Sequence, residues 1–303
     1  MTASTAAARM PEDLQVLVSE VAVPLVGALL VTTLPSPRVD RACWRLTFAD
    51  GRVLKGRYVE TVEQADRLEA LTRRLDHRSF PPVLSRYRRA LLTAWVDGTP
   101  LDRRRWSTAM LGACGAVHGA VHRTRVESRP AWYRRHGDWH ARLESRLRDL
   151  VDARVIEAVE ARRAETLAGR FAPEAAASGL CHGDFCAENI IVDGHARPVV
   201  VDNDSIAVDA YGYDLARTWH RWPMTEAQSH AYMAGYGPAG HLAEVEAHFV
   251  HWAAVVLVEA AAFRVQVGLD GADVPLRRLH ALLQAPHRYG RFPGLVPRGA
   301  RAS

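Results

Sequence analysis

Three side chains that offer oxygen ligands lie close together between residues 181 and 205. Asp184 follows a His-Gly pair in a segment expected to be a loop, and Asn189 stands five positions further along. A short apolar run starts at Asn189, and a second one ends at Asp202. If the two runs pair as a hairpin, Asn189 and Asp202 come to the same end of it. An amide oxygen and a carboxylate at that end form a hard-oxygen site suited to Mg²⁺.

Asp184 would complete a site for phosphoryl transfer. From the adjacent loop, its carboxylate could accept or orient the proton of a hydroxyl group. Phosphoryl transfer depends mainly on positioning and on neutralising charge around the metal. The residue types and their order in this stretch therefore predict transfer of a phosphoryl group to a hydroxyl.

The composition draws attention to Lys55. The chain has 39 Lys and Arg residues together, and Lys55 is the only lysine among them. The only two asparagines, Asn189 and Asn203, both fall in the stretch described above. Chance explains one such coincidence more easily than two. A compact ammonium holds phosphate in a way that a forked guanidinium does not freely replace. Lys55 is therefore predicted to bind nucleotide phosphates.

The N-terminal third of the chain reads as strands with one helix. Two strand-like runs flank an Ala-Asp-Gly turn signal within residues 40–58, which predicts a hairpin. A helix is predicted over residues 61–75, because its leucines recur at helical spacing. A further strand is expected at about residues 90–96, before the Asp97-Gly98 turn.

The remainder of the chain is predicted to be mainly helical. Two short strands, residues 189–193 and 198–202, interrupt helix-like stretches at residues 104–124, 137–168 and 216–285. The predicted fold class is α+β with two lobes. Residues 1–96 would form a small β-rich nucleotide-binding lobe, and residues 97–303 a larger catalytic and substrate-binding lobe. A ligand is expected between the lobes.

Composition limits the partners and the compartment. The net charge is +5, but the arginines are spread along the chain, which favours a solvated surface over nucleic-acid binding. The apolar run at residues 21–34 is too short to span a bilayer and contains Pro24, so no membrane association is expected. Four cysteines in 303 residues do not make a disulfide framework, which favours a cytoplasmic location.

Several motifs resemble the aminoglycoside phosphotransferase / choline kinase superfamily, small-molecule kinases with a protein-kinase-like fold. "HGDFCAEN" at residues 182–189 resembles its HxDxxxxN loop, and "VVVDND" at 199–204 resembles its metal-binding Asp with a second acid two places later. "YDLAR" at 213–217 resembles its Asp-Leu-Ala motif, and "LLTAWVDGTPL" at 91–101 resembles its hinge. "GAVHGAVH" at 115–122 resembles its Leu-His helix. The resemblance covers about residues 40–260.

The resemblance implies an ATP-dependent kinase whose acceptor is a hydroxyl of an antibiotic, a sugar or a metabolite alcohol. Asp184 would be the catalytic base, and Asn189 and Asp202 would bind Mg²⁺, with Asp204 as a candidate further ligand. Lys55 would contact the α- and β-phosphates of ATP.

The same resemblance assigns the remaining site residues. Thr93 would be the gatekeeper, and the backbones of Ala94 and Val96 would bind adenine. Asp214 would brace the catalytic loop, in which His182 begins the His-Gly-Asp motif. These last two roles are structural.

Two features depart from the family pattern. Residues 34–44, where a glycine-rich phosphate loop would lie, contain no glycine. The acid that should pair with Lys55 is also open: Glu63 is favoured as the acid of the first helical turn, and Glu69 fits if the preceding loop is longer. The missing glycines leave one alternative, a nucleotide-binding pseudokinase or scaffold with little turnover, against which the intact catalytic set argues.

Other conspicuous residues have simpler interpretations. Cys181 and Cys186 lack the spacing of a zinc site and are expected to be buried, inert thiols. His118 and His122 have a spacing that can bind metal, but packing and hydrogen bonding are favoured. The aromatic residues at 219–222 could line an acceptor pocket, although helix packing is favoured.

Overall fold

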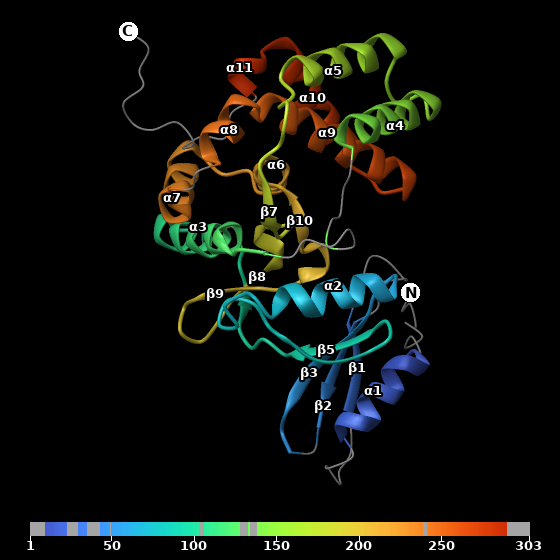
Figure 1. Ribbon diagram of the computed structural model, residues 1–303, viewed down its shortest axis with the longest axis vertical. Helices are drawn as coiled ribbons and strands as arrows, with labels where there is room; N and C mark the ends of the chain where they lie inside the picture. Colours follow the sequence, from blue (N-terminus) through green and yellow to red (C-terminus); the bar gives the residue numbers. More distant parts are fainter. Residues whose placement is uncertain are drawn as a thin grey trace, which may run out of the picture. The chain divides into compact units, whose positions relative to one another are not determined.

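The protein was analysed as a computed structural model, which describes residues 10–22, 30–34, 43–48, 50–102, 106–127, 133, 138–238 and 241–289 (Figure 1). The chain divides into two compact units. Unit 1 comprises Met1–Pro100 and Ile190–Ile206, and unit 2 comprises Leu101–Asn189 and Ala207–Ser303. The segment Ile190–Ile206 thus groups with the N-terminal part of the chain, although it follows residue 97 in sequence. The glycine-free segment at 34–44 lies largely outside the described residues.

Unit 1 is built on a five-stranded antiparallel sheet. Its strand order is β1 (Leu30–Leu34), β2 (Cys43–Thr47), β3 (Val53–Tyr58), β5 (Ala90–Ala94) and β4 (Val83–Tyr87). The predicted hairpin is β2 and β3, and the predicted strand at 90–96 is β5. A second sheet pairs β6 (Thr99–Pro100), β8 (Ile190–Val192) and β9 (Pro198–Val200), with Ile190 opposite Val200.

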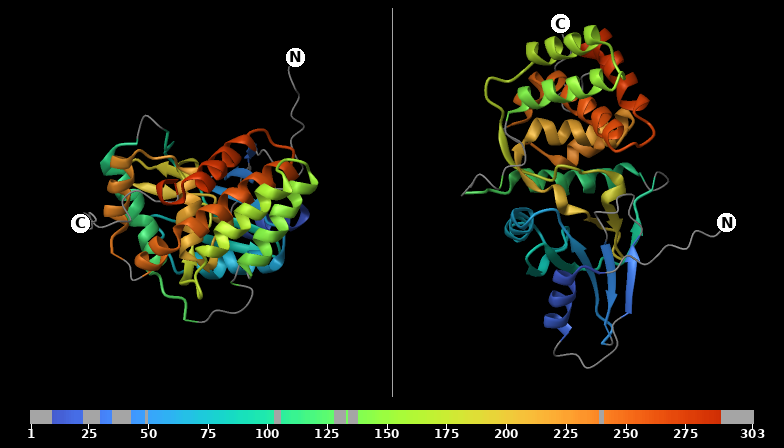
Figure 2. Two further views of the ribbon diagram at one scale, coloured as in Figure 1. Left: turned by 90° about the horizontal axis from the view of Figure 1, so that it is seen from above. Right: turned by 90° about the vertical axis from the view of Figure 1, so that its right-hand side faces the viewer.

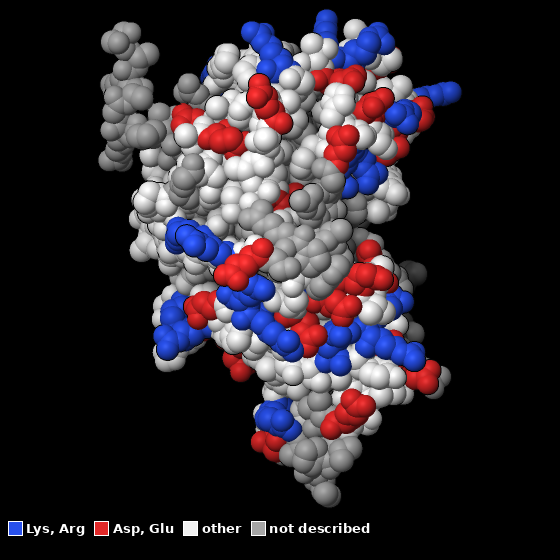
Figure 3. Space-filling model, viewed as in Figure 1, with Lys and Arg blue, Asp and Glu red and all other residues white. Residues whose placement is uncertain are grey.

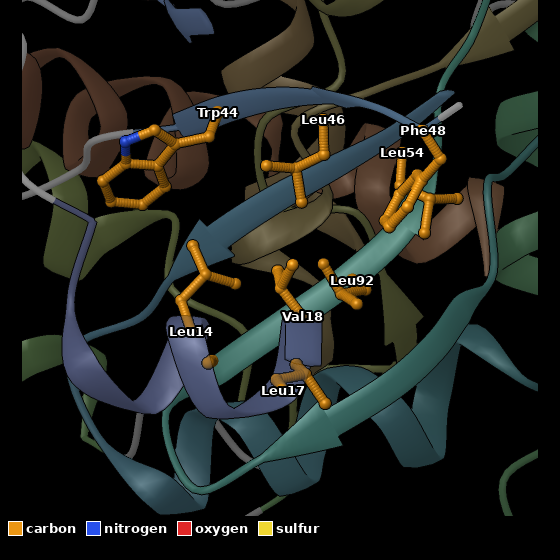
Figure 4. Close-up of a cluster of buried hydrophobic side chains, with 9 residues drawn as sticks. Leu14, Leu17, Val18, Trp44, Leu46, Phe48, Leu54 and Leu92 are labelled. Atoms are coloured by element: carbon orange, nitrogen blue, oxygen red, sulfur yellow. The ribbon is translucent and has the colours of Figure 1, made fainter. Parts of the chain in front are cut away.

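Helix α1 (Glu12–Ala22) covers one face of the five-stranded sheet. Alternate strand residues point to this face, so β2 buries Trp44 and Leu46 there while Cys43 and Arg45 point to the other face. Figure 4 shows Leu14, Leu17 and Val18 of α1 directed at Leu46, Leu54 and Leu92. The sequence analysis assigned no element to residues 12–22, yet these three apolar residues have helical spacing.

Helix α2 (Val62–Thr72) confirms the helix predicted over residues 61–75. The Thr61 side chain caps it by accepting a hydrogen bond from the Gln64 amide, which satisfies one of the free N–H groups of the first turn. The face carrying Ala65, Leu68 and Leu71 is fully buried.

Unit 2 is mainly helical, as predicted. Its helices are α3 (Thr108–Arg123), α4 (Trp139–Asp152), α5 (Ala158–Arg170), α6 (Tyr211–Arg221), α7 (Glu226–Tyr236), α8 (Leu242–Ala247), α9 (Phe249–Gln266), α10 (Asp273–Gln284) and α11 (Pro286–Tyr289). One antiparallel ribbon joins β7 (Ser178–Cys181) and β10 (Ala207–Ala210). The 3₁₀ turn Ala187–Asn189 lies at the end of Leu101–Asn189, the first of the two segments that make up this unit.

Helix α9 forms the centre of unit 2, where it packs on α4, α5, α6 and α10 (Figure 2). Among the described helices it alone is long and apolar enough to cross a bilayer, but 72% of that span is buried within the protein. Burial among neighbouring helices explains why most of its residues are apolar, because a helix surrounded by other helices has little polar face.

The charged side chains are mixed on the visible surface. On the face seen in Figure 3, Lys and Arg side chains are interspersed with Asp and Glu. This distribution agrees with the predicted solvated, arginine-rich surface.

Helices α3 and α7 approach so closely that their backbones touch. A Cβ atom on Gly115 would lie 1.9 Å from the carbonyl oxygen of Tyr232, and one on Gly119 would lie 2.2 Å from that of Tyr236. No real side chain fits at such distances. The glycines of α3 therefore bring its backbone within reach of the tyrosines of α7.

We predict that Gly115→Ala lowers the free energy of unfolding by about 1–3 kcal/mol or more, because the new methyl group meets backbone rather than a movable side chain. The matched control is Gly169→Ala in α5, where nothing lies within 4 Å of the added Cβ. That change should raise stability by about 0.5–1 kcal/mol through helix propensity alone. Urea unfolding of the two variants checks both signs, and a stable Gly115→Ala protein would contradict the close packing.

Candidate active site

A cavity of about 150 Å³ in unit 1 collects most of the residues predicted to bind a nucleotide. Lys55 on β3 lies opposite Thr93 on β5, so the two side chains share one face of the sheet. The chain leaves β5 through Ala94 and then forms the adjoining wall. The complete lining is Lys55, Arg57, Pro81, Thr93, Ala94, Trp95, Val96, Ile191, Val201, Asp202 and Asn203. Five predicted residues, Lys55, Thr93, Ala94, Val96 and Asp202, thus line one cavity.

Lys55 has no acidic partner in the part of the chain that the structure describes. Glu63 lies exposed in the first turn of α2, and no ion pair joins it to Lys55. Glu69 is bound by Arg73 at 2.7 Å and by Arg86 on β4 at 2.9 Å. Neither of the two acids considered for Lys55 is therefore brought to it, and the ammonium remains available to a ligand in the cavity.

Asp202 follows β9 in a backbone conformation that few residues other than glycine adopt, although aspartate adopts it more readily than most. Its backbone is left-handed, with φ 59° and ψ 54°, at the start of the 3₁₀ turn Asn203–Ser205. A non-glycine residue in this region costs energy and is found where function or the surrounding structure requires it. Its side chain is exposed, and no described cationic side chain pairs with it. Asp204 lies outside the cavity lining and pairs instead with Arg57.

Asp184 lies in a loop of unit 2 and is held by three side chains. Its Oδ1 accepts hydrogen bonds from Arg217 Nε at 3.1 Å and from Arg221 Nη1 at 3.3 Å. Its Oδ2 accepts one from Asn189 Nδ2 at 3.3 Å. Burial alone would raise the pKa of Asp184, but the charges of Arg217 and Arg221 outweigh it and lower the pKa below its usual value. The carboxylate is therefore ionised and fixed in orientation.

Asn189 closes this loop through its amide group. Its Nδ2 also donates to the Asp184 carbonyl oxygen at 2.9 Å, so both of its bonds to Asp184 come from the nitrogen. The amide oxygen then points away from Asp184, and no described residue donates a hydrogen bond to it. Asn189 directly precedes Ile190, the first residue of β8.

The donor atoms fit a hard divalent cation. Mg²⁺ prefers carboxylate and amide oxygens and usually takes one or two carboxylates from the protein. Asp202 offers a carboxylate without a cationic partner among the described residues, held in a strained left-handed turn. Asn189 offers an amide oxygen whose nitrogen is already engaged. These residues suit Mg²⁺ far better than a thiol-binding metal.

Asp214 holds the loop that carries Asp184. It is completely buried on α6. Its carboxylate accepts hydrogen bonds from the backbone amides of His182 and Gly183, each at 2.8 Å. Burial would raise its pKa, but the bonds and charges of His118 and His122 hold the pKa well below its usual value. Gly183 takes a positive φ of 76°, which glycine adopts without strain.

His118 and His122 form a hydrogen-bonded cluster with Asp214. Their Nε2 atoms lie 3.1 and 3.0 Å from the same Oδ2 atom of Asp214. Because an ionised carboxylate only accepts, each Nε2 must carry a proton and has no lone pair for a metal. Each Nδ1 is hydrogen-bonded to a tyrosine hydroxyl, that of Tyr232 for His118 and that of Tyr236 for His122. The geometry agrees with the predicted hydrogen-bonding role.

The remaining conspicuous residues also have structural roles. Cys181 and Cys186 are buried, and burial raises the pKa of both thiols, as expected for inert cysteines. Trp222 is buried against Trp106 and Phe185. The Trp219 ring stacks under the guanidinium of Arg278, so packing accounts for both tryptophans.

The sequence analysis missed the two arginines that bind Asp184. Arg217 and Arg221 are four residues apart on α6, a spacing that places both on the same helix face. Arg217 belongs to the "YDLAR" motif, so the sequence could have predicted its place on a helix close to the loop that carries Asp184. The sequence could not have predicted that Arg217 contacts Asp184 itself.

Comparisons with known proteins agree with this geometry. The sequence matches the phosphotransferase enzyme family over residues 39–248, which confirms the resemblance seen in the motifs. No curated protein matches the chain.

Solved structures of similar fold are kinases and phosphotransferases. A thermostable mutant of the aminoglycoside phosphotransferase APH(4)-Ia is 14% identical with a TM-score of 0.67, covering 89% of this chain and 99% of its own. Ethanolamine kinase of Plasmodium vivax is 10% identical with a TM-score of 0.63, covering 88% and 84%. Amicoumacin kinase hAmiN, in complex with AMP-PNP, Ca²⁺ and Ami, is 12% identical with a TM-score of 0.62, covering 91% and 94%. These similarities confirm the predicted bilobal, kinase-like α+β fold.

The buried histidines predict a loss of stability in mild acid. Burial, and then the neighbouring charge of His118, lowers the pKa of His122 from 6.5 to about 3, although Asp214 opposes the shift. Above pH 6.5 neither the folded nor the unfolded chain protonates this group. Between pH 6.5 and 3 the unfolded chain binds a proton that the folded chain excludes. The free energy of unfolding should therefore fall by up to about 1.4 kcal/mol per pH unit for this group.

Urea unfolding between pH 7.5 and 4.5 measures this slope. His122→Gln should reduce the slope by roughly the contribution of one proton, about 1.4 kcal/mol per pH unit. His195→Gln, at an exposed position, serves as the matched control. Equal slopes for wild type and His122→Gln would show that His122 is not buried in its neutral form.

Proposed function

We propose, because this chain belongs to the phosphotransferase enzyme family, that it transfers the γ-phosphoryl group of ATP to a hydroxyl of a small molecule. Family membership makes the chain a small-molecule phosphotransferase. The nucleotide, the metal, the residue roles and the class of acceptor are the parts that we propose.

The environment of Asp184 carries the proposal. A carboxylate offers about four lone-pair sites for hydrogen bonds. Arg217 and Arg221 use two of them on Oδ1, and Asn189 uses one on Oδ2. About one site on Oδ2 remains, and it suits the hydroxyl of an acceptor. Asp184 thus has a fixed direction in which to accept a proton donor.

The lowered pKa of Asp184 defines its role further. A carboxylate with a reduced pKa is a weak base, but it is ionised across the physiological pH range. Phosphoryl transfer needs the nucleophile to be positioned more than it needs early removal of the proton. We therefore assign Asp184 the role of orienting the acceptor hydroxyl for in-line attack and receiving its proton late in the reaction.

The nucleotide would bind in the cavity of unit 1. Lys55 is assigned to the phosphates, Thr93 to the gatekeeper position, and the backbones of Ala94 and Val96 to adenine. The ammonium of Lys55, which pairs with no acid among the described residues, and its place in the cavity lining support this assignment. The amicoumacin kinase of similar fold is described with AMP-PNP and Ca²⁺.

Asn189 and Asp202 are assigned to Mg²⁺. When bound, the ion would neutralise charge that develops on the transferred phosphoryl group. The chain's own contribution is to present oxygen atoms that have no other partner in the described ranges. The amide oxygen of Asn189 is turned away from Asp184, and Asp202 is held in a left-handed turn.

The acceptor is proposed to carry few positive charges. Arg217 and Arg221 lie next to Asp184 and would repel a polycation. After Trp222 the sequence has seven arginines and six acidic residues, so no acidic surplus compensates. A sugar, a metabolite alcohol or an antibiotic of low positive charge fits this environment better than an aminoglycoside does.

The alternatives considered from the sequence are weaker. The family match and the kinases of similar fold give no support to a pseudokinase. Nucleic-acid or membrane binding draws no support from any site described above, and a cytoplasmic location remains a prediction.

A coupled ATP-consumption screen with Mg²⁺ tests the function directly. The panel would contain hydroxylated antibiotics, sugars and amino alcohols, with Asp184→Ala as the matched blank. We expect an acceptor-dependent rate that falls by about 10²–10⁴-fold in Asp184→Ala while the affinity for ATP is nearly unchanged. Comparable turnover in the variant would refute the role of Asp184.

Asp202→Ala should abolish the Mg²⁺ dependence of nucleotide binding, because the variant loses the only carboxylate assigned to the ion. Calorimetric titration of AMP-PNP with and without Mg²⁺ measures this effect. Asp193→Ala, at the turn of the same β8–β9 hairpin, is the matched control and should behave like wild type. Unchanged Mg²⁺-dependent binding in Asp202→Ala would rule out Asp202 as a ligand.

A further inference from the structure

Arg57 and Asp204 form a largely buried ion pair between β3 and the segment that carries Asp202. Arg57 Nη1 donates to Asp204 Oδ1, and the two side chains are only 6% and 17% exposed. Arg57 stands two residues after Lys55 on β3, so both side chains point to the same face of the sheet. The pair therefore connects the strand that carries Lys55 to residues 202–206.

Helix α2 also reaches residues 202–206, where two of its side chains donate to backbone carbonyl oxygens. Gln64 Nε2 donates to the Asp204 carbonyl oxygen at 3.4 Å, and Arg67 Nε donates to the Ile206 carbonyl oxygen at 3.2 Å. No acidic residue of α2 pairs with Lys55 within the described residues. The helix and the strand are thus each joined to residues 202–206 rather than to one another through Lys55.

We propose that Arg57 is a positioning residue that, through Asp204, holds residues 202–206 in the conformation that begins with the left-handed backbone of Asp202. In this arrangement Asp204 serves Arg57 instead of the metal ion. The inference rests on the proposed function, because it assigns residues 202–206 the task of presenting Asp202 to Mg²⁺. It also takes Asp204 out of the set of metal ligands considered from the sequence.

Two physical arguments support this division of roles. Removing two charges from water is costly, and a buried pair compensates this cost only when its geometry is well satisfied. A conformation such as that of Asp202 persists only where the surroundings over-determine it. Three contacts constrain residues 203–206, immediately after Asp202: the ion pair from Arg57 and the hydrogen bonds from Gln64 and Arg67.

The first test measures amide hydrogen exchange of residues 202–206 in the protein without nucleotide or metal. Arg57→Gln and Asp204→Asn should each speed exchange by about tenfold or more, and the double variant should be no faster than the faster single variant. Asp204→Asn keeps the size of the side chain and is the variant most compatible with folding, which urea unfolding verifies. Asp50→Asn, which breaks the exposed Asp50–Arg52 pair, is the matched control and should exchange like wild type.

The second test measures the Mg²⁺ concentration needed for half-maximal binding of AMP-PNP. Each single variant should raise it by about tenfold, again without further loss in the double variant. If Asp204→Asn raises it while Arg57→Gln leaves both exchange and Mg²⁺ dependence at wild-type values, Asp204 is a metal ligand and the proposal fails. If wild type binds no AMP-PNP, the proposed function fails, and the exchange rates still decide whether Arg57 holds the segment.

Discussion

The buried carboxylate of Asp214 is the feature on which unit 2 depends most. Four donors surround it: the amides of His182 and Gly183, and the Nε2 atoms of two histidines on α3. A completely buried charge is tolerated only when hydrogen bonds replace the lost water. Removing any one donor would leave part of that charge unsatisfied. The loop that carries Asp184 is thereby tied to α3 and α6.

The hydrogen bonds that satisfy Asp214 also explain why α3 carries glycines where it faces α7. Histidine rings bind Asp214 through Nε2, so each Nε2 must carry a proton. Tyrosine hydroxyls from α7 hydrogen-bond the Nδ1 atoms and hold the rings in place. Those hydroxyls reach the rings because Gly115 and Gly119 let the two helix backbones touch. The Tyr236 hydroxyl is also hydrogen-bonded to His241 Nε2, so the hydrogen-bonded network continues toward the surface.

Much of this arrangement could be predicted from the sequence, because local rules determine it. The strand-like runs around the Ala-Asp-Gly turn predicted β2 and β3, and the leucine spacing predicted α2. The two apolar runs that start at Asn189 and end at Asp202 predicted a hairpin and a hard-oxygen site. Ion-pair partners could not be predicted, because they depend on side chains far apart in sequence. Glu69 was considered for Lys55, but Arg86 on β4 binds it. Likewise, nothing in the spacing indicated that Arg57 would meet Asp204.

The four aspartates discussed above differ in how many of their carboxylate lone pairs already accept hydrogen bonds or ion pairs from the protein. Asp214 accepts four hydrogen bonds and can bind nothing else, which fits a purely structural role. Asp184 accepts three and retains room for one more donor. Asp204 is committed to Arg57, whereas Asp202 has no cationic partner among the described residues. Because a carboxylate binds a ligand only with the lone pairs that the protein leaves free, the number of donors among the described residues supports the roles proposed for these aspartates. By that number Asp202 is the residue most available to a cation, and Asp184 is the one best prepared for a single hydroxyl.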